Sequence, residues 1–130
     1  MEFTLQIEHV EGVTIADLGG EFDIYSAPRF KELMTAHLER GDRSFIVNLE
    51  SITYLDSSGL AAVVMMFKRT QALGGSLSVV APQPRTKRLL SISGIDRIIS
   101  IFSTRKAALQ AVSAQSAPAP RAADRENAPA

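Results

Sequence analysis

The residues most suited to chemistry are the serines Ser57 and Ser58, which directly follow Asp56. They stand between a short apolar stretch that predicts a strand and the apolar run 60–67, which predicts a helix. Asp56 or Ser57 can simply cap that helix, because a side-chain oxygen there accepts hydrogen bonds from free backbone N–H groups. On spacing alone, this capping role is the more common explanation of such residues.

A hydroxyl at the start of a helix can also carry a phosphoryl group. The helix N-terminus has unpaired N–H groups and a partial positive charge, which together favour a phosphate. Phosphorylation of Ser57 would add a charge of about −1.5 to −2 beside Asp56. A partner that fits the unmodified surface would then meet both bulk and like charge. The second hypothesis is therefore a switch set by phosphorylation of Ser57, with Ser58 as the alternative acceptor.

The sequence gives less support to catalysis by a serine nucleophile, to a histidine ligand site or to a phosphate-binding loop. A nucleophilic serine needs a base and an orienting acid, and the sequence has only His9, expected on the first strand, and His37, expected on the first helix. His37 falls at the edge of an apolar stripe and no second histidine is expected nearby, so we expect it to be a packed or half-exposed residue rather than a ligand. The sequence also lacks the G-x-S-x-G elbow and a phosphate-binding G-x-x-x-x-G-K-S/T loop. We predict a protein that is not an enzyme, with no cofactor and no metal.

The elements that must position the serines alternate along the chain. Strand periodicity in 3–7 and 13–18 predicts a hairpin, after which Gly19-Gly20 breaks the pattern. Ser26 is expected to cap a helix that has a proline in its first turn and ends at Gly41. The remaining predictions are strands at 45–49, 77–80 and 98–102, and helices at 58–73, 85–93 and 104–112.

The order ββαβαβαβα predicts an α/β fold with one mostly parallel mixed sheet, an antiparallel N-terminal hairpin edge and about four covering helices. The composition changes after Val112, beyond which no bulky apolar residue occurs. We therefore predict one domain over residues 1–112 and a disordered Ala/Pro-rich tail over 113–130. Removing this tail should leave the domain's stability unchanged.

Composition excludes several classes of function. Fourteen Lys and Arg balance fourteen Asp and Glu, so the net charge is zero and a nucleic-acid partner is not expected. The N-terminus lacks the features of a secretory signal, and the longest apolar run is far shorter than a membrane span. The chain has no cysteine, which excludes disulfides and thiolate sites and is compatible with a reducing compartment. We expect a cytoplasmic protein without membrane insertion.

The sequence resembles the STAS domains, and among them the free-standing anti-anti-sigma factors of bacteria, over residues 3–112. The stretch 55–60, Leu-Asp-Ser-Ser-Gly-Leu, looks like the phosphorylation motif of that family. The other matching segments, in order, are Gly20-Glu21-Phe22-Asp23 with Ser26-Ala27, Ile46-Val47-Asn48-Leu49, Gly74-Gly75, and Leu89-Leu90 with Gly94-Ile95.

The resemblance implies a role for each residue of the site. Ser57 falls where the family carries its phosphoacceptor, and Ser58 is the neighbouring hydroxyl. Asp23, in the turn after the second strand, matches an acid that supports phosphorylation. Asp56 and Gly59 complete the motif as residues that support the phosphosite or contact the partner.

The resemblance also implies partners. In such systems an anti-sigma factor with serine kinase activity binds the unphosphorylated antagonist and so releases its sigma factor. The kinase then phosphorylates the serine, and a PP2C-type phosphatase restores it, so ATP and metal belong to the partners. A monomer or weak dimer is expected.

Two alternatives keep the fold and change the role. STAS proteins also serve as subunits of ABC-type lipid transporters, and a partner switch can control an output other than a sigma factor. The chain departs from many relatives at Asn48, where they have aspartate, and at Ala61, where they have glycine. Neither departure involves the hydroxyl of Ser57.

Overall fold

The computed structural model describes residues 2–115 and contains a single five-stranded sheet in the order β1-β2-β3-β4-β5. The strands are β1 (Thr4–Val10), β2 (Val13–Phe22), β3 (Ser44–Leu55), β4 (Ser76–Val80) and β5 (Ile101–Phe102). The helices are α1 (Ala27–Glu39), α2 (Ser57–Ala72), α3 (Pro84–Ile92), the 3-10 helix η1 (Ile95–Arg97) and α4 (Arg105–Gln115).

The sheet has the topology that the sequence predicts. β1 and β2 form an antiparallel hairpin, and the pairs β2–β3, β3–β4 and β4–β5 are parallel. The predicted order ββαβαβαβα and the α/β class are confirmed, with η1 as an additional short element. The last helix runs to Gln115, slightly beyond its predicted end at Val112. The rest of the predicted tail lies outside the described residues.

The prediction that Gly19-Gly20 ends the second strand is wrong. β2 continues through both glycines to Phe22, and its pairing with β3 shifts register on either side of them. A Cβ at Gly19 would lie 2.6 Å from the Oγ1 atom of Thr4 on β1, and Gly20 has a φ of 78°. Here the glycines allow a close strand contact and an irregular backbone, which are needed inside a sheet as well as at its end.

The last strand is shorter than predicted. Gly94 adopts a left-handed φ of 81° as the N-cap of η1, and the N–H of Ile99 donates to the carbonyl of Ile95 at 2.9 Å. Ile98 and Ile99 therefore belong to a turn, in which Ile99 is buried, and only Ile101 and Phe102 pair with β4. Burial of an isoleucine does not by itself distinguish a strand from a turn of helix.

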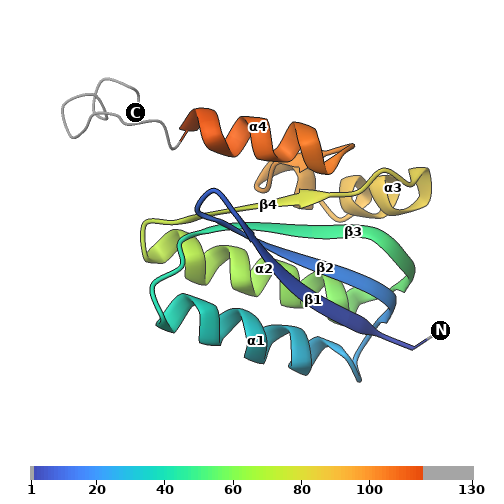
Figure 1. The fold of residues 1–130 in the computed structure, drawn as a ribbon. Coiled ribbons are helices and arrows are strands. Elements are labelled where there is room, and N and C mark those ends of the chain that lie inside the picture. Colours follow the sequence, from blue (N-terminus) through green and yellow to red (C-terminus); the bar gives the residue numbers. More distant parts are fainter. Residues whose placement is uncertain (1, 116–130) are drawn as a thin grey trace.

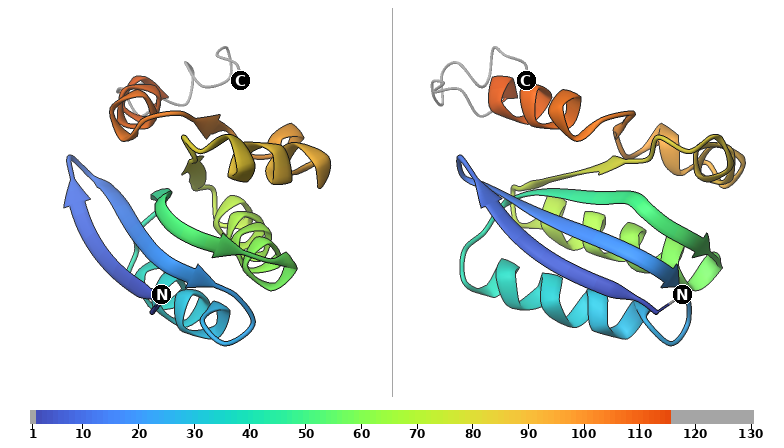
Figure 2. Two further views of the ribbon diagram at one scale, coloured as in Figure 1. Left: turned by 90° about the vertical axis from the view of Figure 1, so that its right-hand side faces the viewer. Right: turned by 45° about the vertical axis from the view of Figure 1, so that its right-hand side comes forward.

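Helices cover the sheet on both faces, and Figures 1 and 2 show α1 and α2 side by side beneath it, with α4 on the opposite side. The larger core cluster joins the α1–α2 face of the sheet to both helices, with Phe30 and Met66 fully buried. The smaller cluster lies under α4 and includes Ile15, Ile46 and Val112. The central part of β3 is buried on both faces, as its continuous apolar run predicts.

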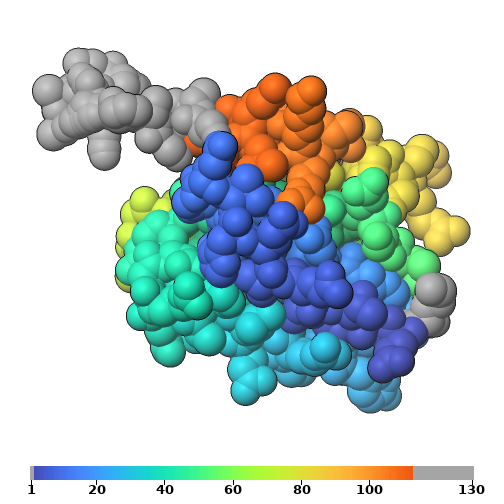
Figure 3. Space-filling view, viewed as in Figure 1, coloured from blue at the N-terminus to red at the C-terminus, as the bar shows by residue number. Residues whose placement is uncertain are grey.

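The hairpin forms an outer edge of the molecule. Figure 3 shows it in blue at the surface, between α1 below and α4 above. Arg105 of α4 forms an ion pair with Glu8 of β1 and lies 3.6 Å from the carboxylate of Asp17 on β2. The other oxygen of Asp17 accepts a hydrogen bond from the amide of Asn48 at 2.8 Å. Within residues 2–115, no helix is both long enough and apolar enough to span a bilayer.

Candidate functional site

The predicted phosphosite lies where two parallel strands end side by side. Phe22, the last residue of β2, pairs with Leu55, the last residue of β3. The N–H of Asp56 then donates to the carbonyl of Phe22 at 3.4 Å, and α2 begins at the next residue, Ser57. Carboxyl ends of parallel strands are where open α/β sheets commonly place functional residues.

Asp56 is the N-cap of α2. Its backbone is extended, with φ −118° and ψ −173°, and its Oδ1 atom accepts hydrogen bonds from the N–H groups of Ser58 at 2.9 Å and Gly59 at 3.2 Å. From the sequence, either Asp56 or Ser57 could be the capping residue, and the structure assigns the cap to Asp56. The Ser57 hydroxyl is therefore not required for capping.

We expect Asp56→Ala to lower the free energy of unfolding by about 1–2 kcal/mol, because two N–H groups of the first turn lose their acceptor. Urea denaturation followed by circular dichroism measures this change. Asp56→Asn is the matched control, since asparagine caps helices about as well as aspartate. Equal stability of Asp56→Ala and the wild-type chain would contradict the capping role.

Gly59 fixes the first turn of α2 against the end of β2. It is buried, and a Cβ at this position would lie 2.6 Å from the carbonyl oxygen of Phe22 and 2.8 Å from the Cδ1 atom of Leu55. The absence of a Cβ at Gly59 therefore lets the start of α2 lie against the ends of β2 and β3.

Ser57 is exposed at the first position of α2, whereas Ser58 is half-buried. Ser57 also lies at one end of an apolar groove of about 550 Å³ that follows the outer face of α2. Met65 is 44% exposed in this groove. The groove spans about 16 Å of helix, at 1.5 Å per residue. Its lining residues are Ser57, Leu60, Ala61, Val64, Met65, Lys68, Ser93 and Ile95.

Asp23 directly follows Phe22 and therefore belongs to the same edge of the sheet, but its hydrogen bonds stay within its own turn. Its Oδ1 atom accepts from the N–H groups of Tyr25 at 3.0 Å and Ser26 at 3.1 Å, and from the Ser26 hydroxyl at 3.2 Å. Asp23 thus shapes the β2–α1 turn, on which Ile24 and Tyr25 are 61% and 89% exposed.

The prediction that Ser26 caps α1 is wrong for its side chain, which makes no capping hydrogen bond to the helix. Its hydroxyl donates to the carbonyl of Glu21 at 2.8 Å and accepts from the N–H of Asp23 at 2.9 Å. The backbone of Ser26 is already helical, with φ −98° and ψ −21°, so the side chain faces back into the turn. Ser26 and Asp23 therefore stabilise the same turn together.

The histidines lie too far from Ser57 to act as its base. His9, His37 and Asp42 cluster before the start of β3, whereas Ser57 follows the end of that strand. β3 is twelve residues long, so at a rise of about 3.3 Å per residue it separates the two places by roughly 36 Å along the strand. This geometry excludes a catalytic triad built on Ser57.

Sequence reasoning located Asp56, Ser57 and the apolar helix but missed the groove. The groove needs Ser93 and Ile95, which follow α2 by more than twenty residues in the chain. The available signal was the apolar run 60–67, since a helix that is apolar around much of its circumference has a second face to cover.

Comparison with known proteins identifies the family. The model of the STAS domain matches residues 4–108. The anti-sigma F factor antagonist of Paenibacillus polymyxa is 31% identical over 110 residues, which cover 84% of this chain and 94% of the relative. The anti-sigma-B factor antagonist of Bacillus subtilis is 31% identical over 110 residues, covering 85% of this chain and all of the relative (100%).

A solved structure agrees with these sequence matches. The crystal structure of an anti-sigma factor antagonist from Mycobacterium paratuberculosis superposes with a TM-score of 0.80 at 25% identity, covering 85% of this chain and 94% of that one. The match with the family model spans all five strands and the first three helices. The chain belongs to the STAS domain family.

Proposed function

We propose that this chain is an anti-sigma factor antagonist controlled by phosphorylation of Ser57. In the unphosphorylated form it binds an anti-sigma factor with serine kinase activity and frees the sigma factor, and phosphorylation ends the binding. The observation that carries the proposal is the exposed hydroxyl of Ser57 at the mouth of an apolar groove. The similarity to proteins named as antagonists of the anti-sigma F and anti-sigma-B factors supports the choice of partner.

The groove gives a physical reason why one phosphate can control binding. A partner segment that lies along α2 covers the exposed side chain of Met65 and the half-buried side chain of Val64, and must pass close to Ser57. A phosphate adds a charge of about −1.5 to −2 at that point, next to the carboxylate of Asp56. Taking this charge out of water against a partner's surface is costly unless the partner supplies cations.

The proposed chemistry uses groups from both proteins. The kinase transfers the γ-phosphoryl group of ATP to the Ser57 Oγ: the bond between the γ-phosphorus and ADP breaks, the bond to Oγ forms, and a base of the kinase takes the hydroxyl proton. Asp23 and Asp56 shape the surface on which the kinase docks. A PP2C-type phosphatase hydrolyses the phosphoserine, and this chain itself acts by binding rather than by catalysis. Because the kinase uses ATP, we place the cycle in the cytoplasm.

We expect incubation with the cognate anti-sigma kinase and Mg-ATP to add one phosphate, about 80 Da, to the intact chain. Peptide mapping by mass spectrometry should place it on Ser57. Ser57→Ala should remain unmodified, whereas Ser58→Ala, the matched control, should still be modified. Modification of Ser58 alone would overturn the assignment of the acceptor.

The same experiment separates the alternatives. A kinase that phosphorylates a known substrate but leaves this chain unmodified would contradict the phosphoswitch and favour a STAS subunit of an ABC-type lipid transporter. Phosphorylation without binding to any anti-sigma factor would favour a partner switch with a different output.

A further inference from the structure

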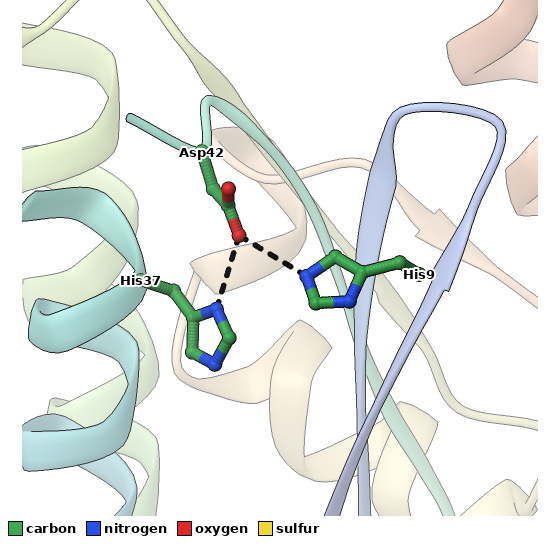
Figure 4. A group of neighbouring side chains, drawn as sticks. All are labelled: His9, His37 and Asp42. Atoms are coloured by element: carbon green, nitrogen blue, oxygen red, sulfur yellow. Dashed lines mark hydrogen bonds and ion pairs between the residues drawn. The ribbon is translucent and has the colours of Figure 1, made fainter. Parts of the chain in front are cut away.

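The end of the domain opposite Ser57 holds a second cluster of polar side chains. His9 comes from β1, His37 from the last turn of α1, and Asp42 from the loop between α1 and β3. Figure 4 shows both rings directed at one carboxylate oxygen. His9 Nε2 lies 3.3 Å and His37 Nδ1 lies 3.0 Å from Asp42 Oδ2. The expectation that His37 has no histidine near it is therefore wrong, since the two ring centroids are 5.5 Å apart.

We propose that His9, His37 and Asp42 form a binding site for a divalent transition-metal ion of the zinc type. Two imidazole nitrogens and one carboxylate oxygen are a common set of zinc ligands. Their three ligand atoms lie within 4.8 Å of one another. In a tetrahedral site with bonds of about 2.0–2.1 Å, neighbouring ligand atoms are about 3.3 Å apart. The two nitrogen–oxygen distances, 3.3 Å and 3.0 Å, are close to this value.

Surrounding groups hold the carboxylate in place. The hydroxyl of Thr14, which is 1% exposed, donates to Asp42 Oδ2 at 2.8 Å. Burial raises the pKa of Asp42, but hydrogen bonds from Thr14, His37 and His9 and the charge of Arg40 outweigh it, so the net pKa is lowered. An oriented carboxylate with its own hydrogen-bond donor is typical of the environment of a metal ligand.

The two histidines differ in access. His37 is buried at 9% exposure, whereas the side chain of His9 is 46% exposed. A metal bound between them is therefore open to solvent on the side of His9, where water can supply the fourth ligand. When the metal binds, His9 Nε2 and His37 Nδ1 carry lone pairs toward it, so the ring protons must lie on the opposite nitrogens.

Hydrogen bonding without metal is the competing explanation. Protonated histidines could share the Asp42 carboxylate, and Arg40 already lies 3.6 Å from its Oδ1 atom. Arg40 is 60% exposed and interacts with the other oxygen, so it leaves Oδ2 to the histidines and Thr14. Added metal distinguishes the two explanations: a metal site binds one ion per chain and saturates, whereas a hydrogen-bonded cluster shows no saturable binding.

A metal here would have a structural effect. Its ligands join the β1–β2 hairpin to the end of α1 and to the loop that leads into β3. β1 is an edge strand and pairs with β2 only. A metal that links His9 on β1 to α1 would therefore hold this edge strand at a further point. The site is far from Ser57 and independent of the proposed phosphoswitch.

The test uses the untagged full chain, treated with EDTA and dialysed. Isothermal titration with zinc sulfate at neutral pH should give one saturable site per chain, and zinc should raise the melting temperature by a few degrees. Cobalt(II), titrated separately, should give the visible absorption of a tetrahedral centre. His9→Gln should weaken zinc binding by at least about tenfold, because even a change outside the ligand sphere can have that effect.

Two further variants make the result specific. Glu39→Gln removes an exposed carboxylate from the same end of α1 without removing a ligand, and its zinc affinity should equal that of the wild-type chain. Asp42→Asn should lose affinity like His9→Gln, with folding checked by circular dichroism. Absence of saturable binding to the wild-type chain, or equal affinity of His9→Gln and wild type, would overturn the proposal and leave a hydrogen-bonded cluster only.

Discussion

Ser57→Asp is expected to weaken binding to the anti-sigma partner by about 100-fold or more. Placing a charge against a surface shaped for a neutral hydroxyl costs several kcal/mol, and about 2.7 kcal/mol corresponds to 100-fold. The new carboxylate would lie at the mouth of the groove along α2, beside Asp56. Ser57→Ala, in contrast, should bind at wild-type strength and, because it cannot be phosphorylated, should stay bound when ATP is added.

Titration of the purified kinase by calorimetry, with and without Mg-ATP, measures both effects. Gln110→Glu is a suitable control, since it adds a negative charge at an exposed position of α4, away from α2. This variant should bind like the wild-type chain. If both Ser57 variants bind with wild-type affinity and respond to ATP as the wild type does, Ser57 is not the switch.

The fold could be predicted well from sequence where local signals determine it. The alternation in β1 and the helical spacing of Phe30, Met34 and Leu38 depend only on which face of each element is buried. Gly74, with a φ of 83°, ends α2 as the sequence indicates. Each of these features involves residues only a few positions apart.

Prediction failed where a distant residue decides the local structure. A glycine pair such as Gly19-Gly20 usually predicts the end of a strand. Here the missing Cβ of Gly19 makes room for Thr4 on β1, and pairing with β3 continues β2 past it. Serine is a common N-cap residue, yet the Ser26 hydroxyl instead donates to the carbonyl of Glu21 and accepts from the N–H of Asp23. Propensity is a weak prior that such tertiary contacts override.

The candidate sites show the same division. Asp56 and Ser57 could be located because the cap, the helix start and the hydroxyl are consecutive in the chain. The cluster of His9, His37 and Asp42 could not, because its members come together only when the hairpin packs against the end of α1. Without knowing that packing, two isolated histidines gave no sign of a shared site.

Gly59→Ala is expected to lower the free energy of unfolding by about 2 kcal/mol, although alanine is the better helix former. Alanine in place of glycine within a helix gains about 0.5–1 kcal/mol from conformational entropy. Here the new Cβ would lie 2.6 Å from the carbonyl oxygen of Phe22, an atom held by the pairing of β2 with β3. Relief requires α2 to move away from the strand ends, and overpacking of this kind costs about 1–3 kcal/mol or somewhat more.

The reciprocal substitution in the same helix isolates this contact. Ala61 is exposed two positions further along α2, so Ala61→Gly should cost only the propensity difference of about 1 kcal/mol. Urea denaturation should therefore show a lower free energy of unfolding for both variants, although one replaces glycine by alanine and the other replaces alanine by glycine. Movement of α2 also displaces Ser57, so Gly59→Ala should slow phosphorylation at temperatures where it is still folded. A Gly59→Ala variant more stable than the wild-type chain would show that the start of α2 is not held against β2, and the proposed positioning of Ser57 would fail with it.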